Sequence, residues 1–192
     1  MTRNASQSTV VAGSPATSTF IALLIALVAA IGGCQSTNQP SPILTEDYVD
    51  LERFAGDWYV IASIPTFIEK DAFDAIESYA VPENGRVETT FSFAKGGFDG
   101  TRKVYRPTGF VTDDGSNAIW GMQFVWPFKG DYRIVYLDDD YTQTVIGRQK
   151  RDYVWIMART PEISDDDYDH IIAFVKSIGY DISKIQRVPQ RW

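Results

Sequence analysis

The feature that most constrains the fold of this chain is an alternation of apolar and polar residues between positions 57 and 159. Such period-two alternation is typical of strands that bury one face and expose the other. We predict strands at 57–64, 75–81, 86–94, 101–111, 118–126, 131–138, 142–149 and 152–159. Short turn segments separate most of them. The pattern predicts an all-β fold, an eight-stranded antiparallel up-and-down barrel.

One helix is predicted after the last strand, at 164–178, and is expected to pack outside the barrel. Ser164 is a favourable N-cap, and three aspartates follow it in the first turn, where the helix dipole stabilises negative charge. Tyr168, Ile171 and Val175 lie on one face at helical spacing. The longest connection between predicted strands, residues 65–74, is rich in apolar side chains and is predicted to act as a lid over the barrel mouth.

The N-terminal segment indicates export. Residues 20–31 form an apolar run too short to span a bilayer, which takes about 20 residues, and the run matches a signal peptide. It ends Ile31-Gly32-Gly33-Cys34, which resembles the lipobox of bacterial lipoproteins. That resemblance implies lipidation of Cys34, and Gln35 after it favours the outer membrane. An ordinary signal peptide with an incidental cysteine, or an uncleaved anchor, is the alternative.

Three regions follow from these patterns: a lipoprotein signal peptide at 1–33, a lipidated tether at 34–47 and a barrel domain at 48–192. The tether assignment rests on two prolines and the absence of charge over residues 35–45. After cleavage, 17 basic side chains face 25 acidic ones, a net charge of −8. Such a charge argues against a nucleic-acid partner.

Strand alternation also predicts which side chains face the barrel interior. If Trp58 points inward, its alternate neighbours do so too, and the same reasoning turns Tyr132 and Trp126 inward. The predicted ligand cavity is lined by Val60, Ala62, Phe91, Phe93, Met122, Phe124, Ile134, Tyr136, Trp155 and Met157. This set is apolar apart from one hydroxyl. The alternative is that the aromatic residues fill a solid core.

Several motifs together resemble the lipocalin family. Gly56-Asp57-Trp58 resembles the lipocalin Gly-x-Trp motif, and Arg159 stands where lipocalins place an arginine that packs across that tryptophan. Trp126-Pro127-Phe128 and the stretch from Arg159 to Lys184 are similar to the bacterial outer-membrane lipocalin and its apolipoprotein D and plant relatives. The resemblance covers residues 48–188. It implies a barrel for hydrophobic ligands that is closed at one end by Gly56, Trp58 and Arg159.

The bacterial branch of the family implies a function. The chain is expected to be a carrier, without a cofactor, that stores or transports fatty acids or lysophospholipids while anchored to the periplasmic side of the outer membrane. A homodimer is a further expectation. Lys70, Arg102 and Lys103 are candidates for binding the lipid head group, or are ordinary surface cations.

Other functions are weighed against the carrier. Cys34 is the sole cysteine and precedes the domain, while the sole histidine, His170, falls on the polar face of the predicted helix. Neither is placed for nucleophilic catalysis, so no enzyme activity is expected. A haem binder normally uses an inward histidine, although a tyrosine could replace it. Binding of haem or another hydrophobic small molecule, or a structural role in the envelope without a ligand, remains open.

Overall fold

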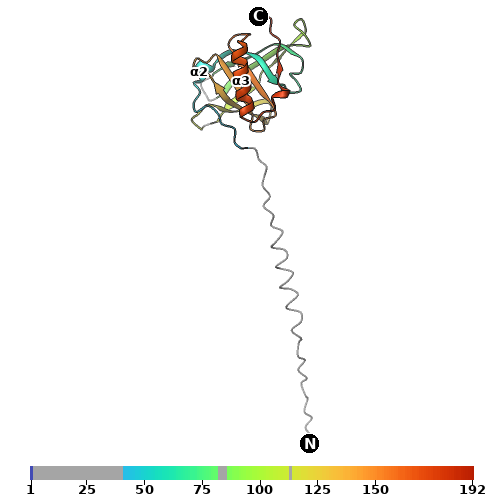
Figure 1. Cartoon of the computed structure of the whole chain (residues 1–192). Helices are drawn as coiled ribbons and strands as arrows, with labels where there is room; N and C mark the ends of the chain where they lie inside the picture. The colour runs from blue at the N-terminus through green and yellow to red at the C-terminus, as the bar shows by residue number, and fades with distance from the viewer. Residues whose placement is uncertain (2–40, 82–85, 113) are drawn as a thin grey trace. The chain divides into compact units, whose positions relative to one another are not determined.

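A computed structural model describes residues 1, 41–81, 86–112 and 114–192 (Figure 1). The predicted signal peptide and Cys34 lie outside the described residues. Residues Pro40–Trp192 form one compact unit. Within the described part of the chain, no helix is both long and apolar enough to cross a membrane.

The unit is a closed antiparallel β-barrel, as predicted. Neighbours along the sheet follow the order β10-β1-β2-β3-β5-β6-β7-β8-β9, β4 pairs with β3, and β1 pairs with β9 to close the barrel. The strands are β1 (Gly56–Ile64), β2 (Ala72–Ala80), β3 (Arg86–Lys95), β4 (Thr101–Tyr105), β5 (Thr108–Val111), β6 (Ile119–Val125), β7 (Phe128–Leu137), β8 (Gln143–Gly147), β9 (Val154–Ala158) and β10 (Gln186–Arg187).

Two differences from the predicted strands have simple causes. The predicted strand 101–111 is two strands, β4 and β5, which both pair with β3. Pro107 lies between them and has no backbone N–H to continue the ladder. The short β10 pairs with Ala62 and Ser63 of β1, and its two residues give no readable alternation.

The helices are α2 (Leu51–Phe54), α3 (Asp165–Ser177) and the 3₁₀ turn η2 (Ile182–Lys184). The predicted helix is α3, and the Ser164 hydroxyl accepts a hydrogen bond from the Asp167 N–H at 3.0 Å. Buried Ile171 and Val175 fix it against the barrel wall, across which it lies in Figure 1. The single turn α2 was not predicted because four residues carry too little periodicity.

Apolar side chains form two cores, one on each face of the sheet. The inner core lies inside the barrel and includes Phe54, Trp58, Val87, Phe93, Trp120, Ile146 and Met157. The outer core lies between the sheet and α3 and includes Ile61, Val135, Val145, Ile156, Ala158, Ile171 and Val175. Strands under the helix are therefore apolar on both faces, which weakens the alternation that identifies the barrel interior.

Part of the predicted tether is packed on the barrel. Ile43 is buried in the outer core, and its N–H donates to Gln149 Oε1 at 3.0 Å. The Glu46 N–H donates to the Ile134 carbonyl at 3.0 Å. Ile43 and Glu46 of the predicted tether are therefore docked on the sheet, since local prolines do not prevent an extended segment from packing there. The division into signal peptide, tether and barrel otherwise stays a prediction.

The closed end of the barrel is organised by Arg159. Its guanidinium lies over the Trp58 ring, with Cζ 3.9 Å from the ring centroid. It also donates to the carbonyls of residues 53, 54, 55 and 57 at 2.8–3.1 Å. Gly56 has φ +96°, and a Cβ there would lie 3.3 Å from Arg159 Nη1. One cation thus binds carbonyls at the end of α2 and the start of β1, and the Phe54 carbonyl also accepts a hydrogen bond from Trp58 Nε1 at 2.9 Å.

Replacing Arg159 should destabilise the barrel. We expect Arg159→Met to lower the free energy of unfolding by about 3 kcal/mol, because hydrogen bonds to a charged group contribute about 1.5–3 kcal/mol each and those to the partly buried carbonyls of residues 54 and 55 are lost. Arg159→Lys keeps the charge but not the fork of donors, so its loss should be intermediate. Urea unfolding measures both. Equal stability of the methionine variant and the wild type would contradict this role.

Candidate ligand-binding site

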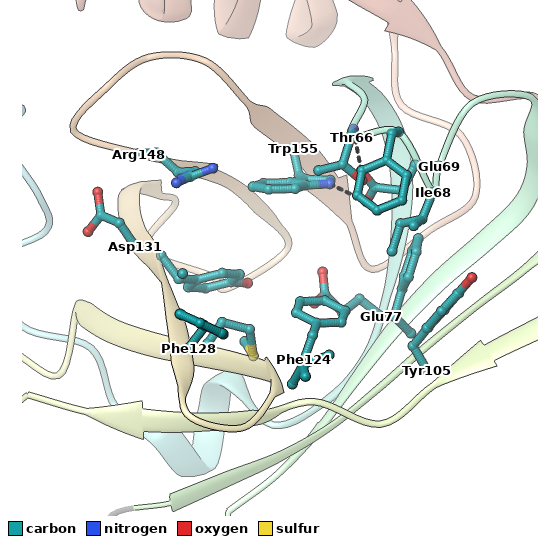
Figure 2. A pocket seen from close by; sticks show the side chains of 16 residues that line it. Thr66, Ile68, Glu69, Glu77, Tyr105, Phe124, Phe128, Asp131, Arg148 and Trp155 are labelled. Carbon is teal, nitrogen blue, oxygen red and sulfur yellow. Dashed lines mark hydrogen bonds between the residues drawn. The ribbon is translucent and has the colours of Figure 1, made fainter.

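A cavity of about 470 Å³ occupies the open half of the barrel (Figure 2). Small-molecule pockets commonly measure about 300–1,000 Å³. Its wall is mostly aromatic and aliphatic, and it consists of Thr66, Phe67, Ile68, Glu69, Glu77, Phe91, Tyr105, Met122, Phe124, Val125, Phe128, Gly130, Asp131, Tyr132, Arg148 and Trp155. The barrel is therefore solid only in its closed half.

The floor of the cavity holds a buried carboxyl. Glu77 stands opposite Trp58 in the β1–β2 ladder, just above the closed end, and its side chain projects into the cavity in Figure 2. Burial raises the pKa of Glu77 to about 8, and the Tyr79 hydroxyl opposes this by hydrogen bonding. Burial also raises the pKa of Tyr79 and Tyr132, whose hydroxyls bond to each other. At neutral pH the floor is consequently uncharged.

The mouth of the cavity is bordered by the connection between β1 and β2. Glu69 in this loop accepts hydrogen bonds from Trp155 Nε1 at 2.7 Å and from the Thr66 N–H at 2.7 Å, as Figure 2 shows. Thr66, Phe67, Ile68 and Glu69 all line the cavity. Glu69 thus joins the loop to the barrel wall at β9. The opening and closing of a lid over 65–74 stays a prediction.

The structure brings four of the ten predicted cavity residues together on the cavity wall: Phe91, Met122, Phe124 and Trp155. Four others, Val60, Phe93, Ile134 and Met157, also lie inside the barrel but belong to the inner core. They are not among the residues that line the cavity. Alternation found the interior face of these strands but not which of the inward side chains border open space.

The remaining two predicted residues, Ala62 and Tyr136, lie in the outer core. The β1–β9 register shifts between Val60 and Ala62, and the β7–β8 register shifts between Ile134 and Tyr136. Such a bulge inserts one extra residue and turns the following side chains to the other face. The prediction that Ala62 and Tyr136 line the cavity is therefore wrong. The Tyr136 ring instead packs against Phe174 of α3, with centroids 5.4 Å apart.

The positions of the predicted cationic residues and of Trp126 also differ from expectation. Lys70, Arg102 and Lys103 do not line the cavity, and Arg148 is the cation on its wall among the described residues. Trp126 was predicted to point inward but is 81% exposed in the turn between β6 and β7. Sequence reasoning missed Glu77, although an available signal was its place between Ala75 and Tyr79 on the apolar face of a predicted strand.

The comparisons with known proteins agree with this architecture. The family model of a lipocalin-like domain matches residues 49–190. The chain belongs to the lipocalin family. This lipocalin is 28% identical over 160 residues to the outer membrane lipoprotein Blc of Citrobacter freundii, covering 82% of this chain and 88% of the relative.

Two further matches, one relative by sequence and one solved structure, extend the comparison. The lipocalin is 31% identical over 154 residues to temperature-induced lipocalin-1 of Arabidopsis thaliana, covering 74% of this chain and 80% of that protein. Among solved structures, insecticyanin from the tobacco hornworm Manduca sexta matches with a TM-score of 0.61 at 16% identity, over 78% of this chain and 84% of that one. The insecticyanin match supports the fold alone.

Family and geometry together give the general function, that of a carrier for small hydrophobic ligands. Lipocalins are generally binding proteins rather than enzymes. His170 is exposed on α3 and does not line the cavity. Across the described residues, no group of three or more His, Cys, Asp and Glu side chains could hold a metal ion.

Proposed function

We propose that this lipocalin binds a single-chain lipid, a fatty acid or a lysophospholipid, and carries it in the bacterial envelope. The observation that supports this most directly is the cavity of about 470 Å³ with an aromatic and aliphatic wall. Transfer of an alkyl chain from water into such a cavity gains about 0.8 kcal/mol per CH₂ group. Rings of Phe91, Tyr132 and Trp155 offer the flat apolar surfaces that an acyl chain would contact.

The polar residues support a ligand orientation with the tail on the floor and the head group at the mouth. Glu77 on the floor is neutral at pH 7 and would tolerate an alkyl chain, whereas a charged head group buried beside it would be costly. Arg148 on the cavity wall carries the positive charge that a carboxylate or phosphate head would meet. Its Nε is buried and has no hydrogen-bond partner among the residues that the structure describes.

The proposed site of action is the periplasmic side of the outer membrane, with Cys34 as the lipid anchor. The lipobox-like sequence before Cys34 supports this placement, as does similarity to a protein named as an outer membrane lipoprotein. Two or three acyl chains would hold the protein durably on a bilayer.

Titration with a fluorescent fatty acid tests the ligand class. We expect saturable fluorescence change at one site per chain, reversed by palmitate and by a lysophospholipid. Displacement by neither lipid, or a haem absorption band that saturates at one haem per chain and blocks the fatty acid, would contradict the proposal. If neither the fatty acids, the lysophospholipid nor haem bound to the protein, a structural role would be favoured.

A further inference from the structure

Exposed apolar side chains surround the mouth of the cavity. The apolar rim consists of Phe67, Phe124, Val125, Trp126 and Phe128, each of which is more than half exposed. Four of them line the cavity, and Trp126 lies between Val125 and Phe128 in the turn that joins β6 to β7. Soluble proteins rarely gather large apolar side chains on one exposed surface unless it binds a partner or a membrane.

The N-terminal segment leaves the barrel at this same end. The Ser41 carbonyl accepts hydrogen bonds from Arg151 Nη2 at 3.0 Å and Gln149 Nε2 at 3.2 Å. The Gln149 N–H in turn donates to Asp131 Oδ2 at 2.7 Å, and Asp131 lines the cavity. Ser41 is therefore fixed beside the mouth and not beside the closed end at Trp58.

Chain length then restricts how an anchored protein can sit. Cys34 precedes Ser41 by seven residues, which span at most about 25 Å even when fully extended. The nine residues of β1 rise about 3.3 Å each, and a strand tilt of about 40° leaves about 23 Å along the barrel axis. To bring the closed end to the bilayer, the seven residues would have to run almost fully extended along the whole barrel, whereas contact at the mouth needs no such extension. An anchor at Cys34 therefore favours an orientation with the mouth at the bilayer surface.

We propose that the apolar rim docks into the interfacial layer of a lipid bilayer, so that the cavity opens directly onto the membrane. The inference rests on the proposed function for its anchor and its ligand. Tryptophan and phenylalanine prefer this interfacial layer. A lipid could then move between bilayer and cavity without crossing water. Because the chain from Cys34 onward has a net charge of −8, apolar contact rather than attraction to anionic lipid drives the docking.

Vesicle flotation of a chain without acyl groups tests the rim by itself. The chain from residue 34 with Cys34→Ser retains the whole compact unit Pro40–Trp192. We expect it to float with phosphatidylcholine vesicles, and to do so equally at high salt. Trp126→Ser should lower the partition coefficient about tenfold, equivalent to about 1.4 kcal/mol. Tyr48→Ser, which removes a 63% exposed aromatic residue near α2 at the closed end, should leave it unchanged.

Several outcomes would overturn the docking surface. One is that the unlipidated chain does not float with the vesicles. Another is that the unlipidated chain, its Trp126→Ser variant and its Tyr48→Ser variant all float equally well. A third is a dimer, seen by light scattering, that Trp126→Ser dissociates without changing flotation, because the rim would then be an interface between copies. Affinity for a fluorescent fatty acid in solution, which Trp126→Ser should retain, tests the proposed function separately. Fatty-acid binding without flotation would reject the docking alone.

Discussion

Gly130→Leu should abolish most of the affinity for long acyl chains while leaving the barrel folded. Gly130 lines the cavity opposite Met122 in the β6–β7 ladder, so a side chain at this position would point inward with that of Met122. A Cβ there would meet only the Met122 carbonyl, at 3.6 Å, which is an ordinary contact. The added carbons would occupy space that the ligand needs, at about 0.8 kcal/mol per displaced CH₂ group. We expect palmitate to bind at least about tenfold more weakly.

A matched substitution controls for the change from glycine to leucine. Gly121 on β6 pairs with Asp131, and its Cβ would face the flexible side chain of Lys129 outside the cavity. Gly121→Leu should retain palmitate affinity. Calorimetric titration gives the affinities, and thermal unfolding confirms that both variants fold. If Gly130→Leu bound palmitate as tightly as the wild type, the cavity would not be the ligand site.

Glu77→Gln should stabilise the protein by an amount that grows with pH. The folded-state pKa of Glu77 is about 8, raised chiefly by burial, against an ordinary value of 4.5. Between these values the folded protein retains a proton that the unfolded chain loses, so the contribution of Glu77 to stability falls as pH rises. At about 1.36 kcal/mol per pH unit, the loss reaches the order of 5 kcal/mol above pH 8. Glutamine cannot ionise, so the Glu77→Gln variant does not undergo this loss of stability.

The measurement is the free energy of unfolding in urea at pH 5 and at pH 9. The difference between Glu77→Gln and the wild type should increase by several kcal/mol between the two. Glu88→Gln, an exposed substitution on the neighbouring strand β3, controls for general effects of removing a negative charge. A Glu77→Gln effect that is the same at both pH values would show that Glu77 is not held neutral in the barrel.

The sequence predicted the barrel well because most strands bury one face only. Where α3 covers the outside, both faces are apolar, and alternation cannot distinguish the inside from the outside. Ala62 and Tyr136 were misplaced there, each just after a register shift. A bulge depends on pairing with a partner strand that is distant in sequence, so local periodicity does not reveal it.

The open space itself was the part that the sequence could not locate. Phe93 and Phe91 share a strand face, yet Phe93 belongs only to the inner core and Phe91 also lines the cavity. Phe93 lies nearer the mouth than Phe91, yet its ring packs against those of Phe91 and Tyr105, with centroids 5.2 and 6.2 Å away. Tyr105 comes from β4, a separate strand that the sequence did not distinguish from β5. Which inward side chains border open space is a property of the packed structure rather than of any one strand.

The central claim, that this cavity holds one acyl chain, is tested most directly by native mass spectrometry of the protein purified from cell envelopes under mild conditions. The account predicts a non-covalent adduct of one single-chain lipid per protein chain, absent from Gly130→Leu purified in the same way. Wild-type protein that carries no lipid, or the same adduct on both proteins, would contradict it.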